Sequence, residues 1–427
     1  MTTSDLVGLR IKTVRRQRGL SQAQLAHPEL SDSYVSLIES GKRTPTPAVL
    51  ELLAQKLDCS LSYLINGVTA EQMEDIELAL GYARLALENG EVAEARTRFE
   101  ELLGNSNLTG LTALRQDAEF GLALATEAGG DLDRAISILL KLRKEELTPE
   151  RGIEVAVALC RAYRESERLT EAVEVGEQML GGNVRLAWTD LLVELGATLL
   201  AAYLERADLL RARQFAAELL NAADALGTPR SIVAANWNAS IVARVTGHGH
   251  EAVSFAERAM AVQLEHGQPR NIARMRVALA KTLLRSGTRD AVAVRNMLRA
   301  AIAEFEQTST STIDRAILHV ELACSEYMTG DLDEAVQHAV TGRNLLPEFG
   351  NVLGAEANLL LGRIYGAVGR VDEGREHTAA VKGWLAPLPD SRRSASTWYA
   401  TAETMEQLGD SEGAVEAYRR ALACAGV

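Results

Sequence analysis

The sequence predicts an all-α protein built from a small N-terminal domain of five helices and a long stack of about nine helical hairpins. Residues 1–66 carry short apolar-periodic segments with helix start and stop signals, and from Glu71 onward one pattern of turn and small residues returns every 37 to 43 residues. No convincing strand pattern is present. We therefore expect two domains, residues 1–66 and residues 71–427.

The second predicted helix begins at Ser21. Gln24 stands three residues later, so the two side chains can form a capping box that satisfies two backbone N–H groups at the helix start. Leu20 before the cap and Leu25 after it supply the matching hydrophobic staple. These signals predict a well-defined entry into a short helix.

The next predicted helix runs from Ser31 to Ser40 and stops at Gly41, because glycine most readily adopts the left-handed conformation that ends a helix. Thr46 and Pro47 then begin a fourth helix with a cap and an N1 proline in order. The apolar residues that recur at helical spacing and should share one small core are Ile11, Val14, Leu25, Val35, Ile38, Leu50, Leu53, Leu57, Leu61 and Leu64.

This segment resembles the Xre family, the helix-turn-helix domains of phage-repressor type. The runs "GLSQAQLA", "SYVSLIESGKRTP" and "CSLSYLING" stand in the family's order and nearly in its spacing. One departure lies in the turn before the third helix, where "HPEL" replaces the family's usual glycine. His27 to Leu37 form an interval one residue shorter than the family's.

The resemblance implies that the helix from Ser31 to Ser40 enters the major groove of DNA. The positions at its base-facing side are occupied here by Asp32, Ser33, Tyr34, Ser36 and Leu37. The positions implied to contact phosphates are Gln22, Lys42 and Arg43. Short polar side chains imply modest discrimination per base, and Leu37 can contact thymine methyl groups. The family pattern pairs Arg15 with Glu39 as a structural ion pair.

Charge is distributed unevenly along the chain. The 427 residues carry 45 basic and 58 acidic side chains, which gives a net charge of −13. Residues 1–66 hold eight basic and six acidic residues, so this part is +2 and the remainder is −15. The repeat body should avoid nucleic acid, and the N-terminal domain will not bind DNA tightly through charge alone. A homodimer with two such domains on two half-sites would strengthen binding to double-stranded DNA.

Several classes of protein are disfavoured by features that the sequence lacks. No segment approaches the length of an apolar membrane span and the N-terminus has no apolar signal-peptide core, so we expect a cytoplasmic protein with no membrane partner. The four cysteines lie far apart, and the "HGH" run at His248 to His250 has no third ligand nearby. No phosphate-binding loop or serine elbow is present. We expect no metal, no cofactor and no enzymatic activity.

The repeat can be aligned on one turn residue in each hairpin. The turn residues are Gly90, Gly130, Glu167, Ala207, Gly247, Gly287, Gly330, Gly369 and Gly409. Five positions after them stand Ala95, Ala135, Ala172, Ala212, Ala252, Val292, Ala335, Gly374 and Ala414. Seven positions before them stand Ala83, Ala123, Cys160, Leu200, Ser240, Ala280, Ala323, Gly362 and Ala402. Mostly small residues at both places allow two antiparallel helices to pack closely.

This pattern resembles the tetratricopeptide repeat, in which helix pairs stack into a superhelix with a concave inner face. The interval of about 40 residues exceeds the 34 of the common repeat, and the excess lies in longer second helices and longer loops. A coiled coil is the main structural alternative, but no heptad persists beyond about three turns.

The first helix of each hairpin should face the groove of such a superhelix. In the fifth to eighth repeats, the residues expected there are Trp237, Asn238, Arg244, Arg274, Lys281, Arg285, Tyr327 and Arg363. Amides can pair with the backbone of an extended peptide, and arginines can hold a carboxylate bidentately. The groove would then favour an acidic group or a C-terminal carboxylate. Alternatively, these cations form structural pairs with Glu194, Glu265, Glu321 or Glu356.

An Xre-type domain joined to a tetratricopeptide body resembles in architecture the RNPP class of regulators, which sense short signalling peptides. The resemblance implies a sequence-specific DNA-binding transcriptional regulator whose repeat domain senses a ligand, with a short peptide as the leading hypothesis, and transmits binding to its DNA-binding domains. Two alternatives remain open. One is a protein-interaction scaffold with a vestigial helix-turn-helix, and the other is a regulator that senses a small molecule.

Overall fold

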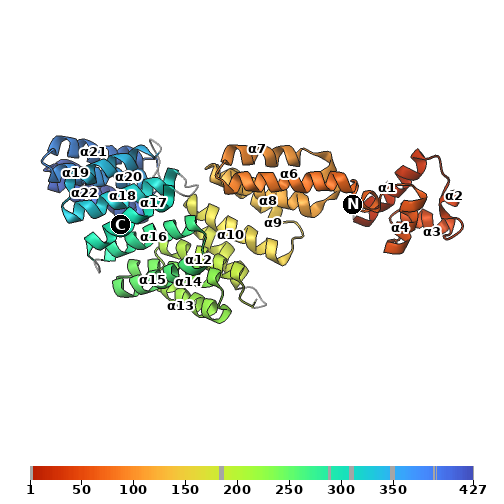
Figure 1. Ribbon diagram of the computed structural model, residues 1–427, viewed down its shortest axis with the longest axis horizontal. Helices are drawn as coiled ribbons and strands as arrows, with labels where there is room; N and C mark the ends of the chain where they lie inside the picture. Colours follow the sequence, from red (N-terminus) through yellow and green to blue (C-terminus); the bar gives the residue numbers. More distant parts are fainter. Residues whose placement is uncertain are drawn as a thin grey trace. The chain divides into compact units, whose positions relative to one another are not determined.

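The computed structural model describes residues 3–181, 187–286, 290–306, 312–346, 352–387, 390 and 392–426. The chain divides into two compact units, Met1–Glu146 and Leu147–Val427 (Figure 1). All regular elements in the described ranges are helices, which confirms the predicted all-α fold. Within these ranges, every helix is too short or too polar to bridge the hydrocarbon core of a membrane.

The first unit begins with five helices that share one core. They are α1 (Thr3–Gln17), α2 (Gln22–Ala26), α3 (Asp32–Glu39), α4 (Pro47–Lys56) and α5 (Leu61–Asn66). The predicted capping box is present, because Gln24 N donates to Ser21 Oγ at 3.1 Å and Ser21 N donates to Gln24 Oε1 at 2.8 Å. Gly41 ends the α3 segment with a φ of +73°. All ten predicted core residues lie in or against this core.

Gly8 allows α1 to pack closely on α3. A Cβ added at Gly8 would stand 2.1 Å from the Ile38 carbonyl oxygen, so any side chain there would push the two helices apart. The position of α3 therefore depends on contacts with α1, and not on its own eight residues alone.

Two helical hairpins complete the first unit. Their elements are α6 (Ala70–Glu88), α7 (Val92–Leu103), the 3-10 helix η1 (Ser106–Gly110), α8 (Thr112–Ala128) and α9 (Leu132–Arg143). Phe99 of α7 is fully buried against Gly121 of α8, where an added Cβ would stand 2.3 Å from the ring. Large side chains of one hairpin thus enter spaces that small residues leave on the next.

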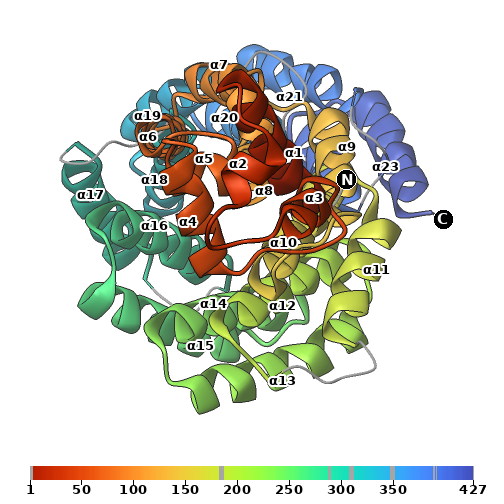
Figure 2. The same ribbon diagram turned by 90° about the vertical axis from the view of Figure 1, so that its right-hand side faces the viewer.

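The second unit consists of seven further hairpins. Their helices are α10 (Pro149–Glu165), α11 (Leu169–Leu180), α12 (Asp190–Glu205), α13 (Leu209–Leu226), α14 (Pro229–Val245), α15 (Gly249–His266), α16 (Pro269–Ser286), α17 (Ala291–Glu306), α18 (Thr312–Thr329), α19 (Leu332–Asn344), α20 (Val352–Ala367), α21 (Val371–Leu385), α22 (Arg392–Gln407) and α23 (Ser411–Ala425). In Figure 2 these helices follow an arc, with α12, α14, α16 and α18 on its inner side and α13, α15 and α17 on its outer side. The nine predicted hairpins are present, two in the first unit and seven in the second.

The predicted turn positions adopt the backbone conformation that the repeat requires. Eight of them lie in the described ranges, and all eight have φ between +60° and +86°. Glu167 and Ala207 adopt this left-handed conformation although they are not glycines, at φ values of 60° and 67°. The ninth predicted turn residue, Gly287, lies outside the described residues.

The predicted register is wrong after the sixth turn. Val292 is 40% exposed, whereas Val294 is 1% exposed and occupies the packing position. Val294 is the fourth residue of α17, as Ala95 is the fourth residue of α7. Four residues separate α16 from α17, whereas two or three separate the helices of the other hairpins, so counting five residues from Gly287 selects the wrong side chain.

Candidate functional site

The N-terminal domain presents a row of short side chains on α3. Asp32, Ser33, Ser36 and Leu37 are exposed, while Val35 and Ile38 on the opposite face are buried in the core. The Ser31 hydroxyl caps the helix by accepting a hydrogen bond from Tyr34 N at 3.2 Å. The exposed side chains near the N-terminal end of a capped helix suit contact with base edges in the major groove.

A buried ion pair holds α3 against α1. Arg15 Nε and Nη2 donate to Glu39 Oε1 and Oε2 at 2.5 and 2.9 Å, and the two side chains are 10% and 2% exposed. Gln22 Nε2 donates to Glu39 Oε2 at 2.8 Å. Burial raises the pKa of the Glu39 carboxyl, but the hydrogen bonds from Arg15 and Gln22 outweigh burial and hold that pKa below its ordinary value. The structural pair expected between Arg15 and Glu39 is therefore present.

The side chains expected to contact phosphates lie beside α3. Lys42 and Arg43 are exposed in the segment that follows the helix, and the Arg43 guanidinium stands 5.1 Å from the centre of the Tyr34 ring. This stacking orients both side chains on the same surface. Gln22 is half-buried and its amide N–H group is already engaged with Glu39, a constraint that the sequence pattern did not indicate.

The second candidate site lies on the inner helices of the second unit. Four cations of α14, α16 and α20 lie near two carboxylates of α18 and α20. The cations are Arg244, Lys281, Arg285 and Arg363, and the carboxylates are Glu321 and Glu356. Cations outnumber carboxylates in this cluster, although the chain as a whole is acidic. The cluster therefore suits an anionic group.

Two of these cations are also structural. Lys281 Nζ stands 3.1 Å from Glu321 Oε1, and Arg285 Nη2 stands 3.8 Å from both the Glu321 and Glu356 carboxylates. Glu321 is buried. The sequence left open whether the expected groove cations bind a ligand or pair with glutamates, and for Lys281 and Arg285 the pairs exist.

Arg244 differs from its neighbours. It is half-buried, and its side chain has neither a hydrogen bond nor an ion pair within the described part of the chain. Burial lowers the pKa of its guanidinium, and the Arg285 charge lowers it further, while Glu321 and Glu356 act in the opposite direction. A half-buried guanidinium with open donors is a strong anchor for a carboxylate.

A small cavity lies next to the cluster. It measures about 270 Å³, and its wall is formed by Arg274, Val277, Ala278, Lys281, Phe305, Asp314 and Ile317. Arg274 Nε donates to Asp314 Oδ2 at 2.8 Å at this wall. The sequence did not single out Asp314. The sequence could have indicated this pair only through the separation of 40 residues between Arg274 and Asp314, which is close to the length of one repeat.

The other expected groove residues lie against hydrophobic clusters or bond their own helix, and Arg363 also bonds a neighbouring helix. Trp237 and Tyr327 lie half-buried against two hydrophobic clusters. Asn238 Nδ2 donates to Ala234 O of its own helix at 2.9 Å, and Arg363 Nε donates to Thr404 Oγ1 at 2.9 Å. The structure thus brings Arg244, Lys281, Arg285 and Arg363 together, and it leaves the two aromatic residues largely within the protein.

The N-terminal domain matches known proteins in sequence. Residues 11–64 match the Helix-turn-helix family model. The HTH-type transcriptional regulator PrpR of Mycobacterium tuberculosis is 37% identical over 70 residues, 16% of this chain and 14% of that protein. The immunity repressor protein of Bacillus phage phi105 is 38% identical over 72 residues, 17% of this chain and 50% of that protein. The chain thus spans half or less of the length of these curated relatives.

The repeat body resembles solved structures in fold. The Rap protein complexed with competence and sporulation factor has a TM-score of 0.51 and 14% identity, over 83% of this chain and 98% of that chain. NprR in complex with its cognate peptide NprX has a TM-score of 0.50 and 13% identity, over 80% of this chain and 88% of that chain. The chain therefore combines an Xre-like helix-turn-helix domain with a tetratricopeptide-type helical body, as its sequence predicts.

Proposed function

We propose that this chain is a sequence-specific DNA-binding transcriptional regulator that acts in the cytoplasm as a homodimer. The supporting observation is the exposed row on α3, which the buried Arg15–Glu39 pair holds in a fixed position. PrpR is a transcriptional regulator and the phi105 protein a repressor by name, and both match this part of the chain. Lys42, Arg43 and Gln22 contact phosphates in this proposal, and the row on α3 reads base edges.

A variant that introduces negative charge on α3 tests this function without disturbing the core. Ser33→Glu with Ser36→Glu places two carboxylates on the exposed side of α3, where they would repel DNA. Ala93→Glu with Thr97→Glu on the exposed side of α7 is the matched control. A regulator loses control of its target genes only with the first pair. A protein-interaction scaffold with a vestigial helix-turn-helix keeps its function with both.

The proposed ligand of the inner helices is a short peptide with an acidic group or a free C-terminal carboxylate. Arg244, which has open donors beside the mixed cluster, is the proposed anchor for that carboxylate. The cavity of about 270 Å³ lies below the usual range for a small-molecule site, so it suits one side chain of a peptide better than a whole ligand. NprR, whose repeat fold is similar, binds a cognate peptide.

The Arg244→Met variant separates ligand binding from stability. Because Arg244 forms no ion pair within the described residues, the variant should keep the thermal stability of the repeat body. Pools of short peptides with free carboxyl ends should raise the melting temperature of the wild type, and amidated pools should not. In the Arg244→Met variant, neither kind of pool should raise the melting temperature. Arg258→Met on the outer helix α15, where Arg258 pairs with Asp224, is the control. The peptide proposal fails if no peptide pool raises the melting temperature of the wild type. It also fails if the Arg274→Glu, Lys281→Glu variant binds the peptides as tightly as the wild type does.

A further inference from the structure

The first repeat exposes a face that every later repeat buries. Leu78, Tyr82 and Leu85 stand twelve, eight and five positions before the turn residue Gly90, and they are 57%, 53% and 50% exposed. The same three positions are buried throughout the eight later repeats, except that Met275 is half-buried. The second repeat, for example, has Ala118, Leu122 and Ala125 there.

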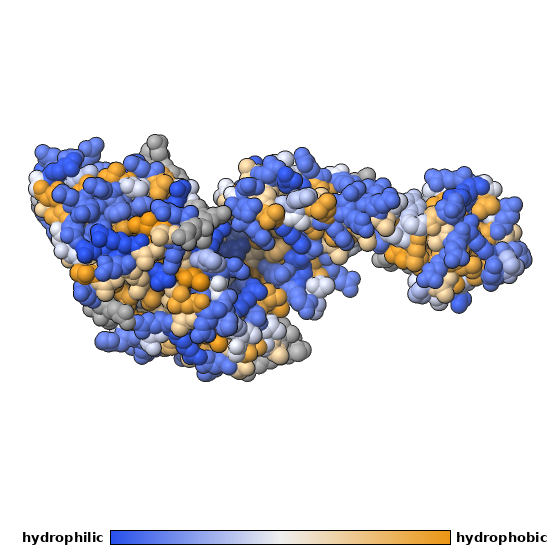
Figure 3. Space-filling model, viewed as in Figure 1, coloured by the Kyte–Doolittle hydropathy of each residue, from blue (hydrophilic) through white to orange (hydrophobic). Residues whose placement is uncertain are grey.

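The second repeat shows which helix packs on the face that corresponds to Leu78, Tyr82 and Leu85. Its residues Ala118, Leu122 and Ala125 belong to the same hydrophobic cluster as Phe99 and Leu102 of the preceding helix α7. The face is therefore the one on which a repeat receives the helix before it. No hairpin precedes α6, so within the described residues its apolar stacking face has no partner hairpin. Figure 3 shows hydrophobic residues at the surface of the α6–α9 segment.

Gly81 lies at the centre of this face. It corresponds to Gly121, which makes room for the Phe99 ring, since a Cβ added at Gly121 would stand only 2.3 Å from ring atoms. A Cβ added at Gly81, by contrast, would meet nothing within 4 Å. A glycine within a helix destabilises it relative to alanine, and no contact among the described residues explains Gly81. At the equivalent place in the second repeat, an aromatic side chain of another helix occupies the space next to the glycine.

We propose that the α6 face formed by Leu78, Gly81, Tyr82 and Leu85 is the dimer interface of this protein, and that a second copy of the chain covers it. The face is self-complementary, because Gly81 and Tyr82 are adjacent. When two α6 helices cross about a two-fold axis at this point, the Tyr82 ring of each copy can enter the space above Gly81 of the other. Such an interface is isologous and closes after two copies.

The choice of a second copy rests on the proposed function. A regulator that reads two half-sites needs two DNA-binding domains, related by a two-fold axis. The α6 face lies in the same compact unit as α1–α5, and α6 begins four residues after α5 ends. A dimer formed there fixes the pair of DNA-binding domains directly.

Sedimentation of the full-length chain without DNA tests the proposal independently of DNA binding. The wild type should form dimers at micromolar concentration, and Gly81→Arg should raise the dimer dissociation constant by at least about tenfold. Because Gly81 is an exposed helix-interior glycine with free space around it, the same variant should keep the helical content of the wild type, measured by circular dichroism. Gly383→Arg is the matched control, since Gly383 is an exposed glycine of α21 whose added Cβ also meets nothing.

Three results would overturn the proposal. They are a wild-type monomer at micromolar concentration, a dimer that Gly81→Arg leaves unchanged, and a dimer that dissociates equally with Gly383→Arg. In the second case, dissociation by Val415→Glu with Leu422→Glu would assign the interface to the exposed side of α23 instead. A wild-type monomer would also remove the homodimer from the proposed function, but none of these results bears on DNA reading by α3, which the Ser33→Glu, Ser36→Glu variant tests separately.

Discussion

Removing the Glu39 carboxylate should selectively destabilise the N-terminal domain. Glu39→Ala leaves the Arg15 guanidinium 10% exposed and without a counter-charge, with the Leu20 carbonyl as its remaining partner at 2.6 Å. Breaking a buried pair from one side costs about 3–5 kcal/mol, and the retained Leu20 bond places this case near about 3 kcal/mol. A domain of this size has a total stability of roughly 3–10 kcal/mol, so a large part of it is lost.

Hydrogen exchange of the α1 and α3 amides measures this loss locally. All four tryptophans lie outside residues 1–66, so tryptophan fluorescence of the same sample reports on the repeat body and should not change. Arg15→Met with Glu39→Leu removes both charges and should recover most of the protection. A fall in protection of less than about tenfold in Glu39→Ala would refute the reasoning, since tenfold corresponds to about 1.4 kcal/mol.

The same ion pair predicts a dependence on pH. The native pKa of Glu39 lies below its ordinary value of 4.5, so the unfolded state binds a proton more readily than the native state. The stability that the pair contributes is therefore complete above pH 4.5 and is lost as the pH falls through the native pKa. Protection of α3 should decline with acid in the wild type and less steeply in the double variant.

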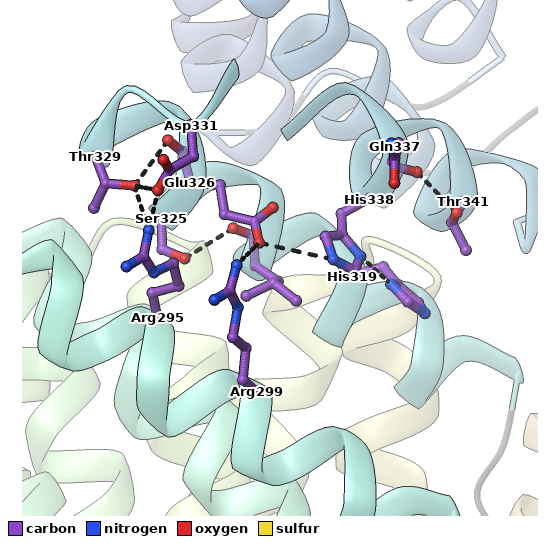
Figure 4. A network of polar contacts seen from close by, with 11 residues as sticks. Arg295, Arg299, His319, Ser325, Glu326, Thr329, Asp331, Gln337, His338 and Thr341 are labelled. Carbon is purple, nitrogen blue, oxygen red and sulfur yellow. Dashed lines mark hydrogen bonds and ion pairs between the residues drawn. The ribbon is translucent and has the colours of Figure 1, made fainter. Parts of the chain in front are cut away.

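Three further predictions concern the repeats. Gly121→Val should lower stability by about 1–3 kcal/mol in thermal unfolding, because the added side chain meets the buried Phe99 ring. Ala207→Gly should raise it by about 1 kcal/mol, because alanine is strained at a φ of 67°. The Nδ1 atoms of His319 and His338 lie 2.9 Å apart (Figure 4). Burial lowers the pKa of both imidazoles, and the neighbouring His338 lowers that of His319 further, as Arg299 does that of His338. Their contribution to stability is complete above the ordinary value of 6.5 and lost as the pH falls below it, so the melting temperature should drop between neutral and mildly acidic pH.

Each of these predictions has a matched control. Gly152→Val, at a glycine of α10 whose added Cβ meets nothing, should lack the loss seen for Gly121→Val. Gly247 occupies the equivalent turn position of the next repeat with a φ of 83°. Gly247→Ala should therefore lower the stability of the protein. His319→Asn with His338→Asn should flatten the acid response, and His250→Asn at an exposed site should not. A steep response that survives the double variant would assign it to other groups.

The turns and caps could be predicted because their signals are local. Gly41 and Gly90 adopt positive φ, and Ser21 and Gln24 cap their helix, through properties of a few adjacent residues. The alignment of repeats even identified Glu167, whose residue type alone gives no sign of a left-handed turn. A repeated spacing therefore carried information that single residues did not.

The candidate sites depended on contacts that a linear pattern cannot reveal. Helical periodicity placed Trp237 and Tyr327 on groove-facing helices, but whether a large side chain points outward or packs inward depends on the size of its neighbours across the interface. The Arg274–Asp314 pair joins two repeats through one side chain from each. The α6 face formed by Leu78, Tyr82 and Leu85 differs from the corresponding faces of later repeats in its exposure, which a linear pattern does not contain.

Selection of genomic DNA fragments by the purified full-length protein, at about 150 mM salt where non-specific phosphate binding is weak, tests the central claim most directly. We predict recovery of a few sites that each contain two related half-sites, and their loss with Ser33→Glu and Ser36→Glu. Equal recovery of fragments by the wild type and this variant would contradict the claim that α3 reads DNA.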